Sequence, residues 1–215
     1  LYEMKTNLTP WMKRILLAGG ILRYENETGS NLPKLDSATV SDFIADILPE
    51  GFSHVKMYEG EGLSPSVYPY NISLSYSSFS NEFAKGYAYI NIIGVGSEDT
   101  VYRKVWASDD GDNAPETDEL SLIAFVDNST PKNNLYHQSV IYCLASMTCA
   151  VDFSVNCLGS YMIKGYMNGS VAFIGPTRNI CFPDAWNKPG DGYAFDLNFL
   201  FWKLAFSRPL EARKP

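Results

Sequence analysis

Three short apolar runs constrain the fold of this chain more than any other feature of its sequence. They span residues 11–20, 87–93 and 138–145, and polar residues or glycines bound each of them. Short runs of this kind are typical of strands that are buried on both faces. Such strands occur in parallel sheets that helices cover, so the runs predict an α/β fold.

Segments with helical periodicity separate these runs. The clearest can be capped by Asp36 or Ser37, ends before Pro49 and Gly51, and repeats apolar residues at i, i+3, i+4 and i+7. These residues are Val40, Phe43, Ile44 and Ile47. We also expect helices at 76–85, 158–168 and 195–206, strands at 54–58 and 171–174, and either a helix or a strand at 120–126. The alternation predicts a single domain over 1–215, a three-layer sandwich with a mostly parallel sheet and helices on both faces.

Charge and hydropathy exclude several classes of partner. The chain has 17 basic and 24 acidic residues, a net charge of -7, and no basic stripe interleaved with aromatic residues, so we expect no nucleic-acid partner. Residues 14–22 and 195–206 are too short or too interrupted by charge to span a bilayer, which needs about 20 apolar residues. The acidic stretch 109–119 is interpreted as a solvated insertion.

The four cysteines predict disulfides and no metal site. They are Cys143, Cys149, Cys157 and Cys181, and none of their spacings is the paired C-x-x-C of a zinc site. One or two disulfides are expected, and Cys149 is interpreted either as the partner of Cys157 or as a small buried hydrophobic residue. We expect neither a structural metal nor a cofactor.

Five Asn-x-Ser/Thr sequons favour a glycoprotein that is extracellular or on a cell surface. The asparagines are Asn7, Asn26, Asn71, Asn128 and Asn168. The chain opens on Leu1 with no leader sequence, which suggests an internal or processed start.

Two strand ends are the candidate functional positions. The run 87–93 leads into the turn Gly94-Val95-Gly96-Ser97, and the run 138–145 ends at Ala145-Ser146. Ligands of parallel sheets bind outside the carboxyl ends of the strands. A nucleotide-binding turn is disfavoured, because Asp99 stands where the third glycine of G-x-G-x-x-G would be.

At these turns the chain resembles the gingipain family of cysteine peptidases, which has a caspase-like fold. The resemblance covers most of the chain and is carried by four segments, of which Gly169 to Arg178 is the most specific. The others are the opening strand, the turn after Ile93 and the block Val140 to Phe153. It implies endopeptidase activity through a thiol-acyl intermediate, and it implies that the domain continues beyond both ends of the chain, next to other domains of a longer parent protein.

The same resemblance places both catalytic positions of the family on residues that cannot do the chemistry. The family's Gly-His-Gly turn maps onto Gly94, Val95 and Gly96, with Val95 at the histidine. Counting back six residues from Asp152, the family's aspartate, places the nucleophilic cysteine at Ser146. Valine cannot transfer a proton, and a serine without a base is a weak nucleophile, so we expect a non-catalytic copy.

Two alternatives stay open. The chain is an active cysteine peptidase if Cys149 acts as the nucleophile, but His137 lies before its strand and is expected roughly 25 to 30 Å from the Ser146 end, and His54 is expected on the surface. Alternatively, it is a binding or structural module whose strand-end cleft holds a peptide or protein ligand.

Overall fold

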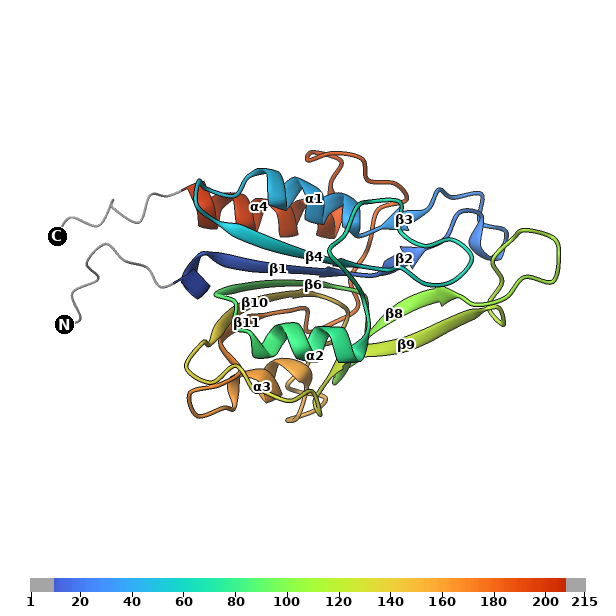
Figure 1. Cartoon of the computed structure of the whole chain (residues 1–215). Helices are drawn as coiled ribbons and strands as arrows, with labels where there is room; N and C mark the ends of the chain where they lie inside the picture. The colour runs from blue at the N-terminus through green and yellow to red at the C-terminus, as the bar shows by residue number, and fades with distance from the viewer. Residues whose placement is uncertain (1–9, 208–215) are drawn as a thin grey trace.

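The fold is built on a six-stranded parallel sheet (Figure 1). A computed structural model describes residues 10–207, so the sequon at Asn7 and the segment 208–215 lie outside the described residues. The strand order is β11-β10-β6-β1-β4-β5, and every adjacent pair is parallel. The strands are β1 (Arg14–Gly19), β4 (Ser53–Tyr58), β5 (Ile72–Ser73), β6 (Tyr89–Ile93), β10 (Ser139–Leu144) and β11 (Ser170–Ile174). The predicted parallel sheet is confirmed.

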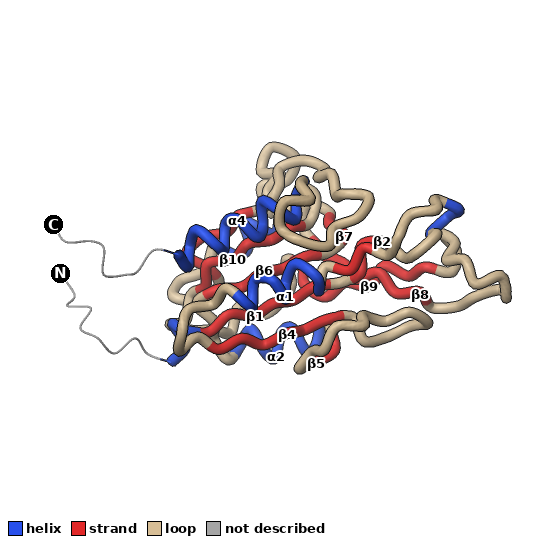
Figure 2. The backbone as a smooth tube through the Cα atoms, turned by 90° about the horizontal axis from the view of Figure 1, so that it is seen from above, coloured by secondary structure: helices blue, strands red, loops and turns tan. Residues whose placement is uncertain are grey.

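Helices cover both faces of this sheet. α1 (Ala38–Asp46) and α4 (Tyr193–Ser207) lie on one face, and α2 (Tyr76–Ala84) and α3 (Leu158–Ile163) lie on the other (Figures 1 and 2). Alternate residues of β1 pack against the two helical layers, because successive side chains of a strand point to opposite faces. Leu16 and Ala18 pack towards α2, while Ile15 and Leu17 pack towards α1 and α4. The three-layer sandwich is confirmed.

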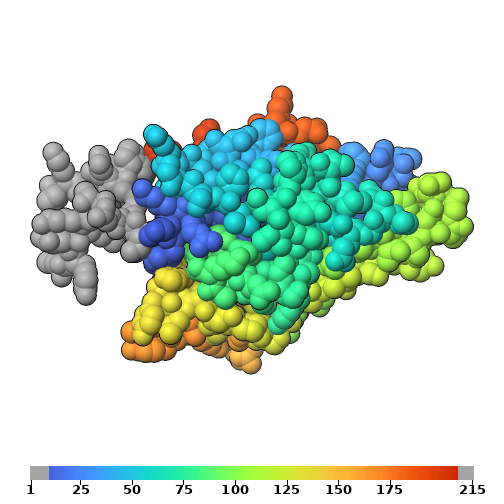
Figure 3. Space-filling view, in the orientation of Figure 1, coloured from blue at the N-terminus to red at the C-terminus, as the bar shows by residue number. Residues whose placement is uncertain are grey.

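A second, antiparallel sheet was not expected from the sequence. Its strands are β2 (Ile21–Arg23), β3 (Leu35–Asp36), β7 (Val95–Gly96), β8 (Thr100–Trp106) and β9 (Leu120–Asp127). β8 and β9 form a long hairpin whose connecting loop is the acidic stretch, and this hairpin projects from the body of the molecule (Figure 3). Residues 120–126, for which a helix or a strand was expected, are therefore in a strand.

Three boundaries differ from the sequence expectation. Pro10–Lys13 form a 3₁₀ helix, so the first strand begins only at Arg14, and Glu27–Gly29 form another. α3 ends at Ile163, not at residue 168, because residues 164–169 turn back towards the β10–β11 edge with Met167 and Gly169 at positive φ. α4 runs from Tyr193 to Ser207 and packs only one side against the sheet, although it carries apolar residues on nearly all sides.

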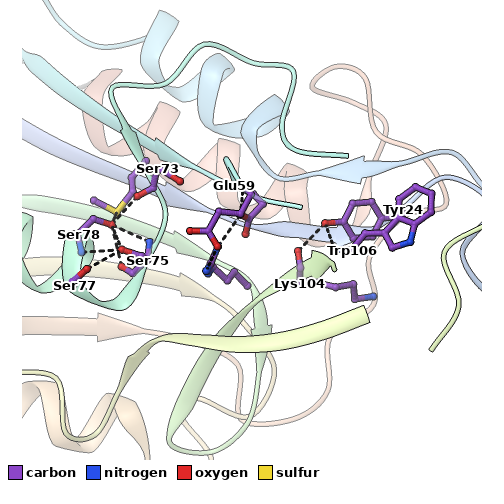
Figure 4. Close-up of polar contacts among 11 residues, drawn as sticks. Tyr24, Glu59, Ser73, Ser75, Ser77, Ser78, Lys104 and Trp106 are labelled. Carbon is purple, nitrogen blue, oxygen red and sulfur yellow. Dashed lines mark hydrogen bonds and ion pairs between the residues drawn. The ribbon is translucent and has the colours of Figure 1, made fainter. Parts of the chain in front are cut away.

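Polar contacts join the two sheets at the end of β4. Arg103 of β8 donates through Nη1 to the Oε1 of Glu59, at 2.9 Å, and through Nη2 to Glu61, at 2.6 Å (Figure 4). Within the second sheet, Tyr24, which follows β2, donates its hydroxyl proton to the Lys104 carbonyl of β8 and accepts from the Trp106 amide. Burial raises the pKa of Glu59, and its contacts with the Glu61 amide and Arg103 oppose that effect. The hairpin is thus fixed to the main sheet by buried side chains.

A buried amide network fixes α4 to the middle of the sheet. Asn91 of β6 and Asn198 of α4 exchange hydrogen bonds through both side-chain amides, at 3.2 and 2.7 Å. The indole of Trp202 donates to the same Asn91 oxygen at 2.9 Å. All three side chains are buried, so the network sets the position of the helix along the sheet.

Among residues 10–207, no helix is long and apolar enough to cross a membrane.

Candidate strand-end site

The carboxyl ends of β6 and β10 lie side by side. These strands are paired in parallel register, with Ile93 opposite Leu144. The amide of Gly94 donates to the Leu144 carbonyl at 3.3 Å, so pairing continues one residue beyond β6. The two turns that the sequence analysis singled out therefore start from the same place on the sheet.

Gly96 brings the two turns into direct contact. A Cβ atom added to this glycine would lie 2.5 Å from the Ser146 amide nitrogen and 2.6 Å from the Ala145 carbonyl carbon. Only a glycine permits this approach of one backbone to another. Gly96, the residue after Val95, is therefore a neighbour of Ser146, and both Val95 and Ser146 are half-buried.

The segment after β11 holds Ser146 in place. Ser146 Oγ accepts a hydrogen bond from the Ile180 amide at 3.2 Å, and the Met147 amide donates to the Arg178 carbonyl at 3.3 Å. Met147 has a φ of 67°, a conformation that costs energy for a residue with a side chain and marks a sharp turn directly after Ser146. The sequence analysis missed Ile180, whose contribution is a backbone group that no residue pattern reveals.

Arg178 and Asp152 form an exposed ion pair beside this turn. The guanidinium donates to both carboxylate oxygens, at 3.1 and 2.6 Å, and lies 5.0 Å above the ring of Phe153. The hydrogen bonds from Arg178 lower the pKa of Asp152. Asp152 thus ties the loop after Ser146 to the segment after β11.

The two histidines lie at the opposite end of the strands. His54 stands at the start of β4, opposite Ile15 of β1, and is exposed. His137 precedes β10, and its ring packs against Trp11 with centroids 5.0 Å apart. Because Ser146 follows the carboxyl end of β10, neither imidazole adjoins the candidate site.

Gly159 and Gly175 pack so closely against the thiol of Cys149 that a side chain at either position would contact it. Its Sγ would lie 2.7 Å from a Cβ on Gly159 and 3.2 Å from one on Gly175. Burial, assisted by the neighbouring Cys157, raises the pKa of Cys149 to about 11, and burial raises that of Cys143 to about 12. All four cysteines are free thiols, so the expected Cys149–Cys157 disulfide is not formed in this structure.

A parallel sheet sandwiched by helices, with paired positions at the ends of two adjacent strands, defines the class of caspase-like α/β domains. The chain belongs to peptidase family C25, whose sequence profile matches residues 1–212. It is a member of a gingipain-type cysteine peptidase family, as the resemblance implied.

Two solved structures share this fold. The crystal structure of the Arg-specific cysteine proteinase gingipain R (RgpB) has a TM-score of 0.56 and 14% identity, covering 91% of this chain and 43% of the gingipain chain. The complex of Porphyromonas gingivalis RgpB pro- and mature domains has a TM-score of 0.53 and 14% identity, covering 91% and 44%. The chain thus spans less than half the length of these proteins. No curated protein matches it significantly.

Proposed function

We propose that this chain is a non-catalytic member of its peptidase family, in which the strand-end site keeps its architecture and has lost its reacting groups. The observation that carries the proposal is the contact of Gly96 with Ser146, which supports an alignment of the two family positions with Val95 and Ser146. A thiolate and an imidazole would have to stand at these two positions for thiol catalysis.

The side chains at these two positions support the loss of the catalytic base and nucleophile. Val95 carries no group that can accept a proton. The Ser146 hydroxyl accepts from the Ile180 amide, and both imidazoles of the chain are at the amino ends of the strands. A serine hydroxyl without a neighbouring base is not activated for attack on a carbonyl.

Restoring the two groups tests this proposal. A thiol-reactive peptidyl trap should leave the natural protein unmodified in intact-mass analysis, whereas the double variant Val95→His, Ser146→Cys should gain one adduct on residue 146. The single variants are matched controls: Ser146→Cys alone should react much more slowly, because no imidazole raises its thiolate fraction. Turnover of a peptide by the natural protein would overturn the proposal.

The alternative of an active peptidase that uses Cys149 receives less support. A thiol with a pKa of about 11 is protonated near neutral pH, and protonated thiols are poor nucleophiles. An adduct on Cys149 that disappears in Cys149→Ser would establish this alternative. An adduct on Cys181, which is exposed, would count as non-specific labelling and is separated by peptide mapping.

A role in binding a peptide or protein ligand is favoured by the loop after Ser146. Val151, Phe153 and Val155 are 57%, 65% and 72% exposed. Exposed apolar groups beside the strand-end site suit an apolar peptide segment. Phe153→Asp should weaken the binding of a fluorescent apolar peptide. Leu135→Asp, at an exposed leucine before β10, should not.

An extracellular or cell-surface location with N-linked glycans is part of the proposal. Among the described sequons, Asn26 and Asn71 are exposed, which supports access to a glycosylating enzyme. Asn168 Oδ1 is buried without a hydrogen-bond partner, which disfavours that site. Glycopeptide mapping of the secreted protein should find glycans at Asn26 and Asn71 but not at Asn168.

A further inference from the structure

α4 presents an apolar stripe to solvent on the side that faces away from the sheet. Its sheet-facing residues include Phe195, Asn198, Phe199 and Trp202, which are buried. On the opposite side, Tyr193, Leu197, Leu200 and Leu204 are 62%, 65%, 46% and 65% exposed. α4 itself lies in the outer layer of the molecule (Figures 1 and 2).

The solvent-exposed side of α2 is polar, unlike that of α4. α2, on the opposite face of the sheet, exposes Ser77 and Asn81, and the exposed Lys85 follows at its end. A helix in contact with water carries polar residues on its outer side, as α2 does. Exposure to water alone therefore does not explain the apolar residues on the outer side of α4.

The spacing of the stripe is that of a coiled-coil seam. The four residues are separated by four, three and four positions, which is the a/d pattern of a heptad with Leu197 and Leu204 at a. The residues that pack on the sheet occupy the b, c and f positions and, with Ala194 and Phe201, the e positions, so the a and d positions stay free. α4 can therefore bind a second helix and stay packed on its sheet.

Two charged residues beside the stripe indicate which partner helix binds and whether it runs parallel or antiparallel to α4. Asp196 and Lys203 are seven residues apart and both occupy g positions on the same flank. In an antiparallel pair of helices g positions face each other, so Asp196 of one copy meets Lys203 of the other. In a parallel pair Asp196 would face Phe201 at e. Asp196 is also held in place by the Gly190 and Gly192 amides and the Trp186 indole.

We propose that the outer face of α4 is the interface between two copies of this chain, joined as an antiparallel α4 pair around a two-fold axis at Leu200. Leu200 then meets its own counterpart, and Leu197 packs near Leu204 of the other copy. The stripe is about 16 Å long. Such an interface is smaller than the roughly 800 Å² per partner of a standard stable complex, so the dimer is weak and depends on concentration.

Light scattering coupled to size exclusion tests the proposal. Over an about hundredfold range of protein concentration the mass should rise from that of a monomer towards that of a dimer. Leu197→Glu should weaken the dimer at least about tenfold, because each copy loses a buried leucine, while Leu135→Glu should not. Lys203→Asp should also weaken it and Lys203→Arg should not. Circular dichroism confirms that the variants remain folded.

Cross-linking tests the geometry. In a Cys181→Ser background, Leu200→Cys should form a covalent dimer when oxidised glutathione is added, whereas Leu135→Cys should not. A monomer at all concentrations would overturn the proposal, and so would a dimer that Leu197→Glu leaves intact. A dimer that Leu197→Glu disrupts but Leu200→Cys fails to cross-link would overturn the antiparallel arrangement.

Discussion

Gly96 lies in van der Waals contact with the backbone of Ser146, and this contact joins the turns after β6 and β10. Both turns begin where a parallel strand ends, but strand pairing alone does not determine how closely they approach. The absence of a side chain at residue 96 decides it.

Replacing this glycine should therefore cost stability. Gly96→Ala places a Cβ 2.5 Å from the Ser146 amide nitrogen, and a backbone neighbour cannot move away cheaply. We expect a loss of about 2–3 kcal/mol in the free energy of unfolding, measured in urea. Gly29→Ala is the matched control: nothing lies near its Cβ position, and its positive φ costs only about 1 kcal/mol. Equal losses would contradict the close contact.

The amide network under α4 gives a second expectation. Asn198→Ala leaves the buried amide of Asn91 without one of its partners, so we expect a loss of about 1–3 kcal/mol in urea unfolding. Asn81→Ala on the exposed side of α2 should change stability by less than about 0.5 kcal/mol. If Asn198→Ala unfolds with an unchanged free energy, the network contributes little to stability.

The ion pair beside Ser146 predicts a titration. Because hydrogen bonds from Arg178 lower the pKa of Asp152, its stabilising effect is present above the ordinary aspartate pKa and is lost as the pH falls through the lowered value. Carboxyl NMR should find the pKa of Asp152 below about 3.9 and return it to that value in Arg178→Ala. An unchanged pKa in the variant would exclude the pair in solution.

Thiol labelling provides a fourth test. Cys181 is exposed, whereas burial raises the pKa of Cys149 to about 11 and that of Cys143 to about 12. Iodoacetamide near neutral pH should modify Cys181 first and Cys143 last, as followed by peptide mass mapping. Labelling of Cys149 ahead of Cys181 would indicate an activated thiol, contrary to the proposed function.

The parallel sheet and its helices could be predicted from the sequence. Residues 87–93 and 138–145 are apolar on both sides, which only a strand covered on two faces accommodates, and the repeat from Val40 to Ile47 fits only a helix. The resemblance also predicted Val95 and Ser146 as the family's two catalytic positions, because their neighbours in the chain carry the pattern; this assignment stays a prediction. These are local signals, and the sequence contains them in full.

The contacts between distant segments could not be predicted in this way. β8 and β9 pair across the acidic loop, Ile180 holds Ser146 through a backbone amide, and α4 leaves Leu197 and Leu204 uncovered. Each depends on contacts between residues far apart in the chain or on which side of a helix meets the sheet. Composition and periodicity are averages over a segment, so they predict that α4 is apolar but not which of its sides is left for a partner.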